Sequence, residues 1–339
     1  MHTGASRKDI ARAAGVAEST VSRALNDSPL ISAEVKRRVR ESAASLGYVP
    51  SRQAARFATR KTFHLGFVVR SYRTFAPFSR PYFPALLDGA VLGAEERGYY
   101  ITIILDRHHD TIDDIVKLVK SREVDGLIMS VTPVDDHRIE ALKHSAVPFV
   151  LINNYMEGVS SVDGDPQPGM RLAFEHARSL GHRVVGYVTG DLGFRNAVDR
   201  LDVFKALAQE FQVDARVVQG DFSKTSGYAA AGTLLQSGSP PTLIMTAADR
   251  EAFGIMDYCR QHHIRIPQDV SLIGYDNLDP ANTVSPALTT VDNPVTRSGY
   301  EGAQLLIDIL EGKAVGPKAR KLDTGFVARE STGPVSTAS

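Results

Sequence analysis

The sequence predicts two folds in one chain: a small all-α helix-turn-helix head, followed by an α/β body of two Rossmann-like, doubly wound subdomains. Charge is divided unevenly, because residues 1–61 contain 12 Lys and Arg against 5 Asp and Glu, whereas the other 278 residues contain 27 against 34. Residues 1–61 also show only short helical patterns. From Phe63 onward, short apolar runs alternate with amphipathic helical stretches, which is typical of βαβ units and parallel sheets.

The composition is that of a soluble globular protein and excludes the fibrous and disordered classes. The 339 residues are 43% hydrophobic and 23% charged, and their formal charges cancel. At about 100–200 residues per domain, this length predicts two or three domains. The first residues have no apolar signal region, and no apolar run approaches the ~18 residues that span a bilayer. We therefore expect a cytoplasmic, nucleoid-associated protein.

The head begins with two short helices joined by a tight turn. Ser6 precedes Asp9 by three residues, a spacing like that of a capping box, and predicts a helix over Arg7–Ala14. Gly15 stands where a C-cap glycine is expected. After the turn, the pattern predicts a second helix over Glu18–Leu25. Two short helices joined in this way, followed by a third, form the helix-turn-helix arrangement.

The third helix, capped by Ser32 and ended by Gly47, has an apolar stripe formed by Val35, Val39, Ala43 and Leu46. The second helix instead exposes small polar and charged groups, which a bland three-helix bundle would not need. Ser, Thr and Asn can bond phosphate oxygens, Arg can pair with guanine, and Glu can accept from cytosine. The candidate DNA-binding residues of the head are Ser6, Glu18, Ser19, Thr20, Ser22, Arg23 and Asn26.

The body is predicted to contain parallel strands with helices between them. The strand candidates are Leu65–Val69, Tyr100–Leu105, Gly126–Ser130, Phe149–Ile152, Val184–Val188, Leu243–Thr246 and Ser271–Tyr275. The helix candidates are Pro84–Arg97, Ile112–Lys120, Arg171–Leu180, Ala197–Glu210, Ser226–Leu235 and Arg250–His262. Ser160–Gly169, rich in Gly, Pro and Asp, is predicted to be a crossover between two subdomains. Ligands of such sheets bind beyond the carboxyl ends of the strands, here in the cleft between subdomains.

Several blocks of the sequence resemble the lactose/galactose repressor family of bacterial transcriptional regulators. The most specific block is Asp9–Asn26, and Leu46–Pro50 and the stretch to Lys61 continue it. Matching blocks in the body are Gly181-His182-Arg183, Gly274-Tyr275-Asp276, Leu288-Thr289-Thr290 and Arg329-Glu330-Ser331-Thr332. Their order and spacing extend the resemblance over nearly the whole chain.

The resemblance implies a helix-turn-helix DNA-binding domain at 1–50, a hinge at 51–61 and a ligand-binding and dimerisation domain at 62–334, similar to periplasmic binding proteins. Its N-subdomain would comprise about 62–160 plus 293–320, and its C-subdomain about 161–291 plus 322–334. The chain would cross back near Val291–Val295 and again near Lys318–Asp323.

Two positions depart from the family pattern. Ala17 stands where the family has a Ser that caps the recognition helix, and its loss would cost about 1 kcal/mol. In the hinge, Ser51–Phe57 matches the family, so the resemblance implies DNA contacts by Ala54 and Phe57. Phe57 replaces the usual Leu that enters the minor groove, and Phe also acts as such a wedge. The alternative is that Phe57 packs on the body.

The resemblance also implies an effector site in the cleft, at Tyr82, Phe83, Asn196, Arg200, Phe222, Asp249 and Asp276. Arg200 would grip ligand oxygens, Phe222 would stack on the ligand ring, and Asp276 would accept hydrogen bonds. Asp249 is preceded by Ala248 instead of the usual Asn, so one polar contact is missing. The long Arg70–Arg80 loop could line the cleft or form a lid.

The leading interpretation is a DNA-binding transcriptional regulator, of repressor type, that binds a near-palindromic operator as a homodimer. Its operator affinity would be controlled by a small-molecule effector. Phe194 stands where purine-binding relatives tend to have a charged group, which favours a sugar or sugar derivative. There are no leucine heptads after Thr332 that would form a zipper-type tetramer.

Two alternatives remain open: a sugar-binding protein for transport, and a sugar- or nucleotide-processing enzyme on the same α/β body. The sequence has no nucleophile elbow, Walker loop or HExxH motif, so we expect no catalysis and no cofactor. Cys259 with His262 and His263 could suggest a metal, but this stretch has the pattern of the end of an amphipathic helix.

Overall fold

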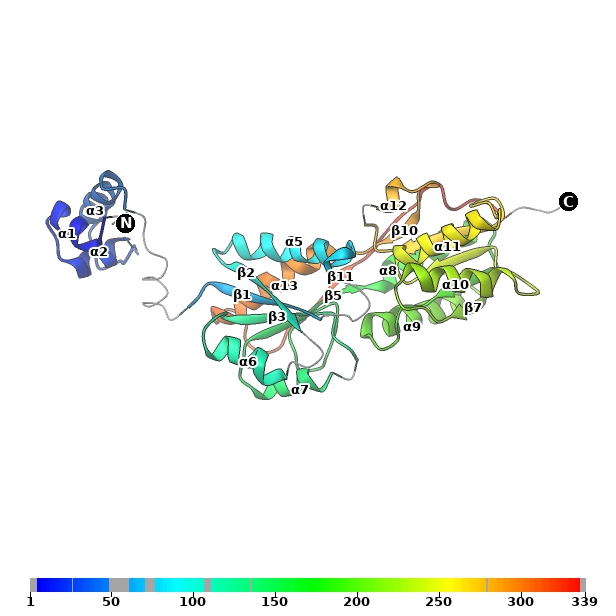
Figure 1. Ribbon diagram of the computed structural model, residues 1–339, viewed down its shortest axis with the longest axis horizontal. Coiled ribbons are helices and arrows are strands. Elements are labelled where there is room, and N and C mark those ends of the chain that lie inside the picture. Colours follow the sequence, from blue (N-terminus) through cyan, green and yellow to red (C-terminus); the bar gives the residue numbers. More distant parts are fainter. Residues whose placement is uncertain are drawn as a thin grey trace. The chain divides into compact units, whose positions relative to one another are not determined.

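The computed structural model describes residues 5–25, 27–48, 61–70, 77–106, 111–134, 136–278 and 280–335 (Figure 1). The chain forms two compact units, Met1–Lys61 and Thr62–Ser339, which are called the head and the body below. Within the described ranges, no helix combines the length and the apolar character needed to cross a membrane.

The head contains the three predicted helices, α1 (Arg7–Ala14), α2 (Glu18–Leu25) and α3 (Ala33–Ser45). The capping box at its start is confirmed, because the Asp9 N–H donates to Ser6 Oγ at 3.3 Å and the Ser6 N–H donates to Asp9 Oδ2 at 2.9 Å. Gly15 ends α1 with a φ of 61°, in the left-handed region that glycine adopts without strain.

Small and branched apolar side chains close the core of the head: Ile10, Ala11, Ala14, Val21, Ala24, Val39 and Ala43. The expected inward position of Leu46 is wrong. Because α3 ends at Ser45, Leu46 no longer follows the helical stripe and its side chain is exposed.

The body contains two six-stranded sheets (Figure 1). The first has the order β11-β5-β4-β3-β1-β2 and is entirely parallel; its strands are β1 (His64–Arg70), β2 (Tyr100–Asp106), β3 (Gly126–Ser130), β4 (Phe149–Ile152), β5 (Ser161–Asp165) and β11 (Ala319–Asp323). The second has the order β12-β10-β9-β8-β6-β7; its strands are β6 (Val184–Val188), β7 (Asp214–Val218), β8 (Leu243–Thr246), β9 (Ser271–Tyr275), β10 (Thr289–Asp292) and β12 (Gly325–Val327). Only the pairing of β12 with β10 is antiparallel among these strands.

Helices pack on both faces of each sheet. Those of the first subdomain are α5 (Tyr82–Glu95), preceded by η1 (Pro77–Ser79), α6 (Ile112–Lys120), α7 (His137–His144) and α13 (Val295–Leu310). Those of the second are α8 (Pro166–Ser179), α9 (Arg195–Glu210), α10 (Lys224–Leu235), α11 (Asp249–Gln261) and α12 (Pro280–Thr283). One apolar core joins α5 and α13 to the first sheet, and a separate core joins α6 and α7 to it. In the second subdomain, α8 and α9 share one core, and α10 and α11 share the other.

The chain crosses between the two sheets three times. It leaves the first sheet between β5 and α8, returns between β10 and α13, and leaves again at Thr324, between β11 and β12. The predicted crossover at Ser160–Gly169 therefore contains a strand. Strand β5 is rich in Asp and Gly, which are uncommon in strands, but backbone pairing with β4 and β11 holds it in the sheet. The first sheet therefore includes β5, which ends at Asp165, and β11, which ends at Asp323. The predicted segments of the N-subdomain ended earlier, at about 160 and 320.

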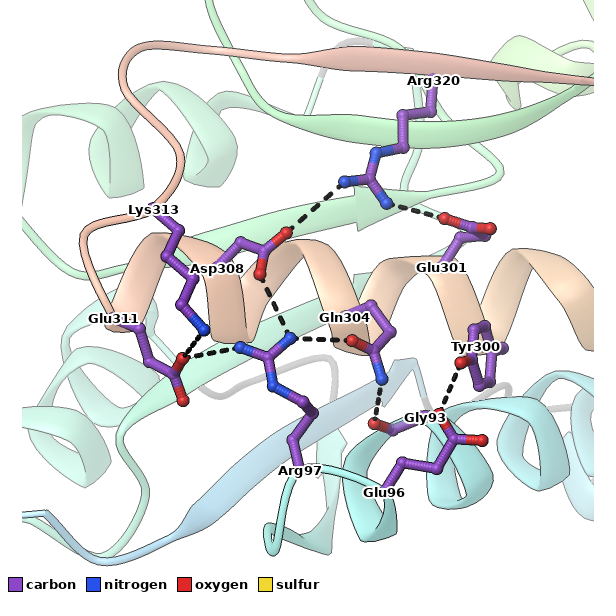
Figure 2. A network of polar contacts seen from close by, with 10 residues as sticks. All are labelled: Gly93, Glu96, Arg97, Tyr300, Glu301, Gln304, Asp308, Glu311, Lys313 and Arg320. Carbon is purple, nitrogen blue, oxygen red and sulfur yellow. Dashed lines mark hydrogen bonds and ion pairs between the residues drawn. The ribbon is translucent and has the colours of Figure 1, made fainter.

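Helices α5 and α13 lie unusually close together. A Cβ added to Gly89 would lie 1.8 Å from the Thr296 carbonyl oxygen, and one added to Gly299 would lie 2.0 Å from the Leu86 carbonyl oxygen. Figure 2 shows the polar network beside this crossing. Arg97, just after α5, donates to Gln304 at 2.9 Å, Asp308 at 3.2 Å and Glu311 at 2.6 Å, all in or next to α13, while Arg320 of β11 donates to Glu301.

Candidate DNA-reading face and effector cleft

Helix α2 presents a polar face on the surface of the head. Glu18, Ser19 and Arg23 are exposed, and Thr20 and Ser22 are half-buried, while Val21 and Ala24 face the core. The residue before the helix, Ala17, offers its carbonyl oxygen to the Thr20 N–H at 2.9 Å, but has no side-chain acceptor.

Other cations of the head are engaged with acids. Lys36 and Arg40 of α3 both lie near Asp27 Oδ1, at 3.1 and 2.8 Å, and Arg37 pairs with Glu41 at 3.0 Å. Ser6 serves as the cap of α1, and its hydroxyl also donates to Asp9 Oδ2 at 2.6 Å. Three predicted DNA-binding residues, Asn26, Ala54 and Phe57, lie outside the described residues.

The body contains a cavity of about 320 Å³ to which both subdomains contribute. Its wall includes all seven residues predicted for an effector site: Tyr82, Phe83, Asn196, Arg200, Phe222, Asp249 and Asp276. They come from the starts of α5, α9 and α11 and from the loops after β7 and β9, so elements far apart in sequence converge here.

Arg200 lies at the centre of the buried polar groups. Its Nη1 donates to the Ala247 carbonyl oxygen at 2.5 Å, and its guanidinium carbon lies 3.8 Å from the centroid of the Tyr275 ring. Its Nη2 lies 3.8 Å from Asp276 Oδ1, which accepts from the Asn293 amide at 3.0 Å. Burial raises the pKa of Asp276 to about 6, although the Arg200 charge opposes this shift. The guanidinium thus lies over an aromatic ring, with Asp276 beside it.

Asp249 is a carboxyl group with its partners inside the protein. Its Oδ1 accepts from the Thr290 hydroxyl at 2.5 Å, and its Oδ2 accepts from the Leu278 N–H at 3.2 Å. Burial and then the charge of Asp276 raise the pKa of Asp249 to about 7. Near neutral pH, Asp249 is therefore present in both its protonated and its ionised form.

The loop before α10 holds Phe222 in an unusual conformation, with a φ of 63°. Its backbone N–H donates to Glu251 Oε1 at 2.9 Å. Glu251 is fully buried, and this burial raises its pKa well above the ordinary value. The Phe222 ring lies so close to Gly190 that an added Cβ would be 2.0 Å from Phe222 Cζ. A buried acid and a glycine thus hold the ring at the cavity wall.

On the opposite wall, Tyr82 and Phe83 meet edge to face, with ring centroids 5.6 Å apart. The Tyr82 hydroxyl accepts a hydrogen bond from the Asn153 amide. The long loop before them, Arg70–Arg80, is only partly described, and its last residue, Arg80, lines the cavity.

Other wall residues were not predicted as site residues, and they include Arg250, Asp191, Asp221 and Phe253. Arg250 is the second residue of α11, directly after the predicted Asp249. Its place beside Asp249 in the first turn of that helix was the signal that could have identified it as a wall residue. Cys259 is buried, which raises its pKa to about 11. No group of three or more His, Cys, Asp or Glu in the described part of the chain could hold a metal ion.

Comparison with known proteins adds two family matches. Residues 7–51 match the model of bacterial regulatory proteins of the lacI family, and residues 174–332 match that of the periplasmic binding protein-like domain. The chain is 30% identical to the HTH-type transcriptional regulator CelR of Thermobifida fusca over 95% of this chain and 96% of that protein. It is 28% identical to the HTH-type transcriptional repressor PurR of Edwardsiella ictaluri, over 96% of each chain.

Solved structures agree with these matches. The structure of the lac repressor dimer bound to operator and the anti-inducer ONPF superposes with a TM-score of 0.80 at 25% identity, covering 98% of this chain and 100% of that one. A complex of the transcriptional regulator CelR with cellobiose gives a TM-score of 0.74 at 28% identity, covering 96% of this chain and 99% of that one.

Proposed function

Because the chain belongs to the LacI family of bacterial regulatory proteins, we propose that it binds a near-palindromic operator as a homodimer and represses transcription, and that a small-molecule effector controls its affinity for DNA. The chain is a DNA-binding transcriptional regulator, and the effector we propose is a sugar or sugar derivative in the cleft of the body. Such a regulator acts where bacterial DNA lies, in the cytoplasm.

The DNA-binding proposal rests on the two faces of α2, one apolar and buried and the other polar and exposed. Its apolar side chains, Val21 and Ala24, close the core, and its polar ones, Glu18, Ser19 and Arg23, remain exposed. A helix of this kind fits the major groove, where Arg and Glu can read base edges and Ser and Thr can bind phosphates. We assign base reading to Arg23 and phosphate contacts to Thr20 and Ser22.

Exposed apolar side chains support the homodimer. Val91 and Leu92 on α5 and Tyr100, Ile103 and Leu105 on β2 are all exposed. Strand β2 is the outer strand of the first sheet. Apolar groups on an outer strand and on a helix of the same subdomain are suited to cover one another across a twofold axis.

The effector proposal rests on the convergence of Arg200, Asp276 and aromatic rings in one cavity. Both subdomains line it, so a ligand there favours one arrangement of the subdomains over another. A ligand alters operator affinity only as far as it binds those arrangements differently. The alternative of an enzyme is tested by a turnover assay against sugar phosphates.

The test of DNA reading uses the full-length protein and an operator selected from random duplexes. Arg23→Ala should weaken operator binding by ~1–3 kcal/mol and relax the preference at one base pair in each half-site. Arg12→Ala removes another exposed arginine, from α1, and should leave that preference unchanged. Equal losses of affinity by Arg23→Ala on selected and on random DNA would show that Arg23 contacts only phosphates.

A further inference from the structure

Helices α5, α9 and α11, which begin at the cavity, all start without a side-chain cap, as does α13, which does not line it. The first-turn residues of α5, α9 and α11 line the cavity, and each helix starts after a residue without a side-chain cap: Pro81, Phe194 and Ala248. By contrast, α8 and α10 are capped by the side chains of Asp165 and Ser223. One N–H in each of these first turns bonds to a backbone carbonyl oxygen: Phe83 to Arg80, Ala197 to Phe194 and Glu251 to Ala248. A helix start without a side-chain cap nevertheless keeps the partial positive charge of the helix dipole.

Arginine side chains add full positive charge at the same place. Arg80, Arg200 and Arg250 all line the cavity. Arg200 is already held by the Ala247 carbonyl oxygen and Tyr275. Arg250 differs from Arg200, because the Nε of Arg250 is buried and has no hydrogen-bond partner among the residues described. It also belongs to the first turn of α11, one of the uncapped helices. Arg250 therefore needs an acceptor that the described protein does not supply.

A second buried group at the cavity also lacks a partner. Asn196 is 9% exposed, and its Oδ1 meets no hydrogen-bond donor in the described ranges. It lies in the first turn of α9 and lines the cavity. A buried polar atom of this kind costs free energy unless a ligand or water satisfies it. A ligand hydroxyl is a suitable donor.

The acids of the wall have donors from the chain itself. Asp191 Oδ1 accepts from the Gly193 N–H at 2.9 Å, and Asp221 Oδ1 accepts from the Ser223 N–H at 2.9 Å. Asp276 accepts from the Asn293 amide, and both oxygens of Asp249 accept from Thr290 and Leu278. The negative groups are thus partly compensated within the protein, whereas the buried Nε of Arg250 is not.

From this arrangement we propose that the effector is an acidic sugar derivative, whose carboxylate or phosphate binds Arg250 at the start of α11. Its ring lies between Phe222 and Tyr82, and one of its hydroxyl groups donates to Asn196. Bidentate pairing with a guanidinium and bonding to helix amides are the usual means of holding such anions. The cavity of about 320 Å³ has room for one sugar ring with its acidic group. This inference rests on the proposed effector function of the cleft.

The experiment compares acids with their neutral parents: glucuronate with glucose, galacturonate with galactose, and glucose 6-phosphate with glucose. Melting temperature and calorimetric Kd are measured on the full-length protein at matched ionic strength. We expect at least one acid to raise the melting temperature and its neutral parent to bind at least tenfold more weakly. The first two pairs test the carboxylate and the third tests the phosphate.

Two variants on the same helix sharpen this comparison. Arg250→Gln should weaken binding of the acid about tenfold or more, and Arg250→Lys should retain part of it. Arg260→Gln removes an exposed arginine that does not line this cavity, and should bind the acid as the wild type does. Circular dichroism and operator binding verify that each variant is folded.

The outcomes separate the inference from the function on which it rests. If neutral sugars bind as tightly as their acids, or if Arg250→Gln leaves the affinity for the acid unchanged, the anionic effector is excluded and a neutral sugar effector stands. If neither acids nor neutral sugars bind while operator binding persists, the sugar effector itself is wrong and the inference fails with it.

Discussion

Asp249 is a carboxyl group whose surroundings favour its protonated form. Burial and the neighbouring Asp276 raise its pKa from the ordinary value of about 4 to about 7. Between these values, the folded protein holds a proton that the unfolded chain has released. Because the folded state then binds more protons, the free energy of unfolding falls as pH rises through this interval, by about 1.4 kcal/mol for each unit of difference in pKa.

We therefore predict that Asp249→Asn reduces the fall in stability between pH 5 and pH 8, as measured by urea unfolding at each pH. The loss of one acceptor will lower stability at every pH, so the slope is the diagnostic quantity. Asp269→Asn is the control: Arg265 lowers the pKa of Asp269 to about 2, so this group stays ionised across the interval. Equal slopes for Asp249→Asn and the wild type would mean that Asp249 is ionised in the folded protein at neutral pH.

Single residues of the cleft were predictable where the resemblance supplied a position, as for Arg200 and Phe222. The groups that hold them were not. Nothing in the sequence indicates that Glu251 is fully buried and accepts a hydrogen bond from the Phe222 backbone N–H. Arg250 likewise has the appearance of an ordinary exposed cation in a helix. Their roles depend on which way the start of α11 points, and that is set by tertiary packing.

At the scale of elements, the crossing of α5 and α13 depends on glycine. A Cβ at Gly299 would lie 2.0 Å from the Leu86 carbonyl oxygen, which belongs to backbone and cannot move alone. Gly299→Ala should lower stability by ~1–3 kcal/mol or more, despite the gain in helix propensity of about 1 kcal/mol. Urea unfolding measures the difference.

Gly238→Ala is the matched control, because an added Cβ there meets no atom within 4 Å. It should change stability by less than about 0.5 kcal/mol. If Gly299→Ala is as stable as this control, the two helices can separate without cost, and the close crossing would not be required for the fold.

Most strands with a continuous apolar pattern were predicted, and strands without one were not. Among the helices, α7 and the largely apolar α13 were not predicted. Strands such as β3 and β8 are apolar and fully buried, so their pattern identified them. Strand β7, at the edge of the second sheet, is largely exposed and begins with a charged residue, and the sequence pattern did not reveal it. Strand β5 was read as a crossover for a related reason, because only its neighbours in the sheet make it a strand.

At the scale of the whole molecule, the proposed homodimer gives a direct prediction. Leu92 is 55% exposed on α5. Leu92→Glu would place a charge in the apolar contact between two copies, so it should yield a monomer in sedimentation velocity. Operator affinity should fall more than tenfold, because the two heads would no longer bind as a linked pair. Leu172→Glu, a similarly exposed leucine on α8, should remain dimeric. A dimeric Leu92→Glu protein would move the interface elsewhere.

The three crossings of the chain also set an order of events while the protein is being made. Helices α1 to α3 are contiguous, so the head can fold as soon as it leaves the ribosome. The first sheet of the body begins at His64, but its core needs Leu305 and Leu306 of α13, and its last strand is β11. At about 5–20 residues per second, these segments appear roughly 10–50 s after β1. Each nascent chain therefore carries a folded DNA-reading head for tens of seconds before the part that senses the effector is complete.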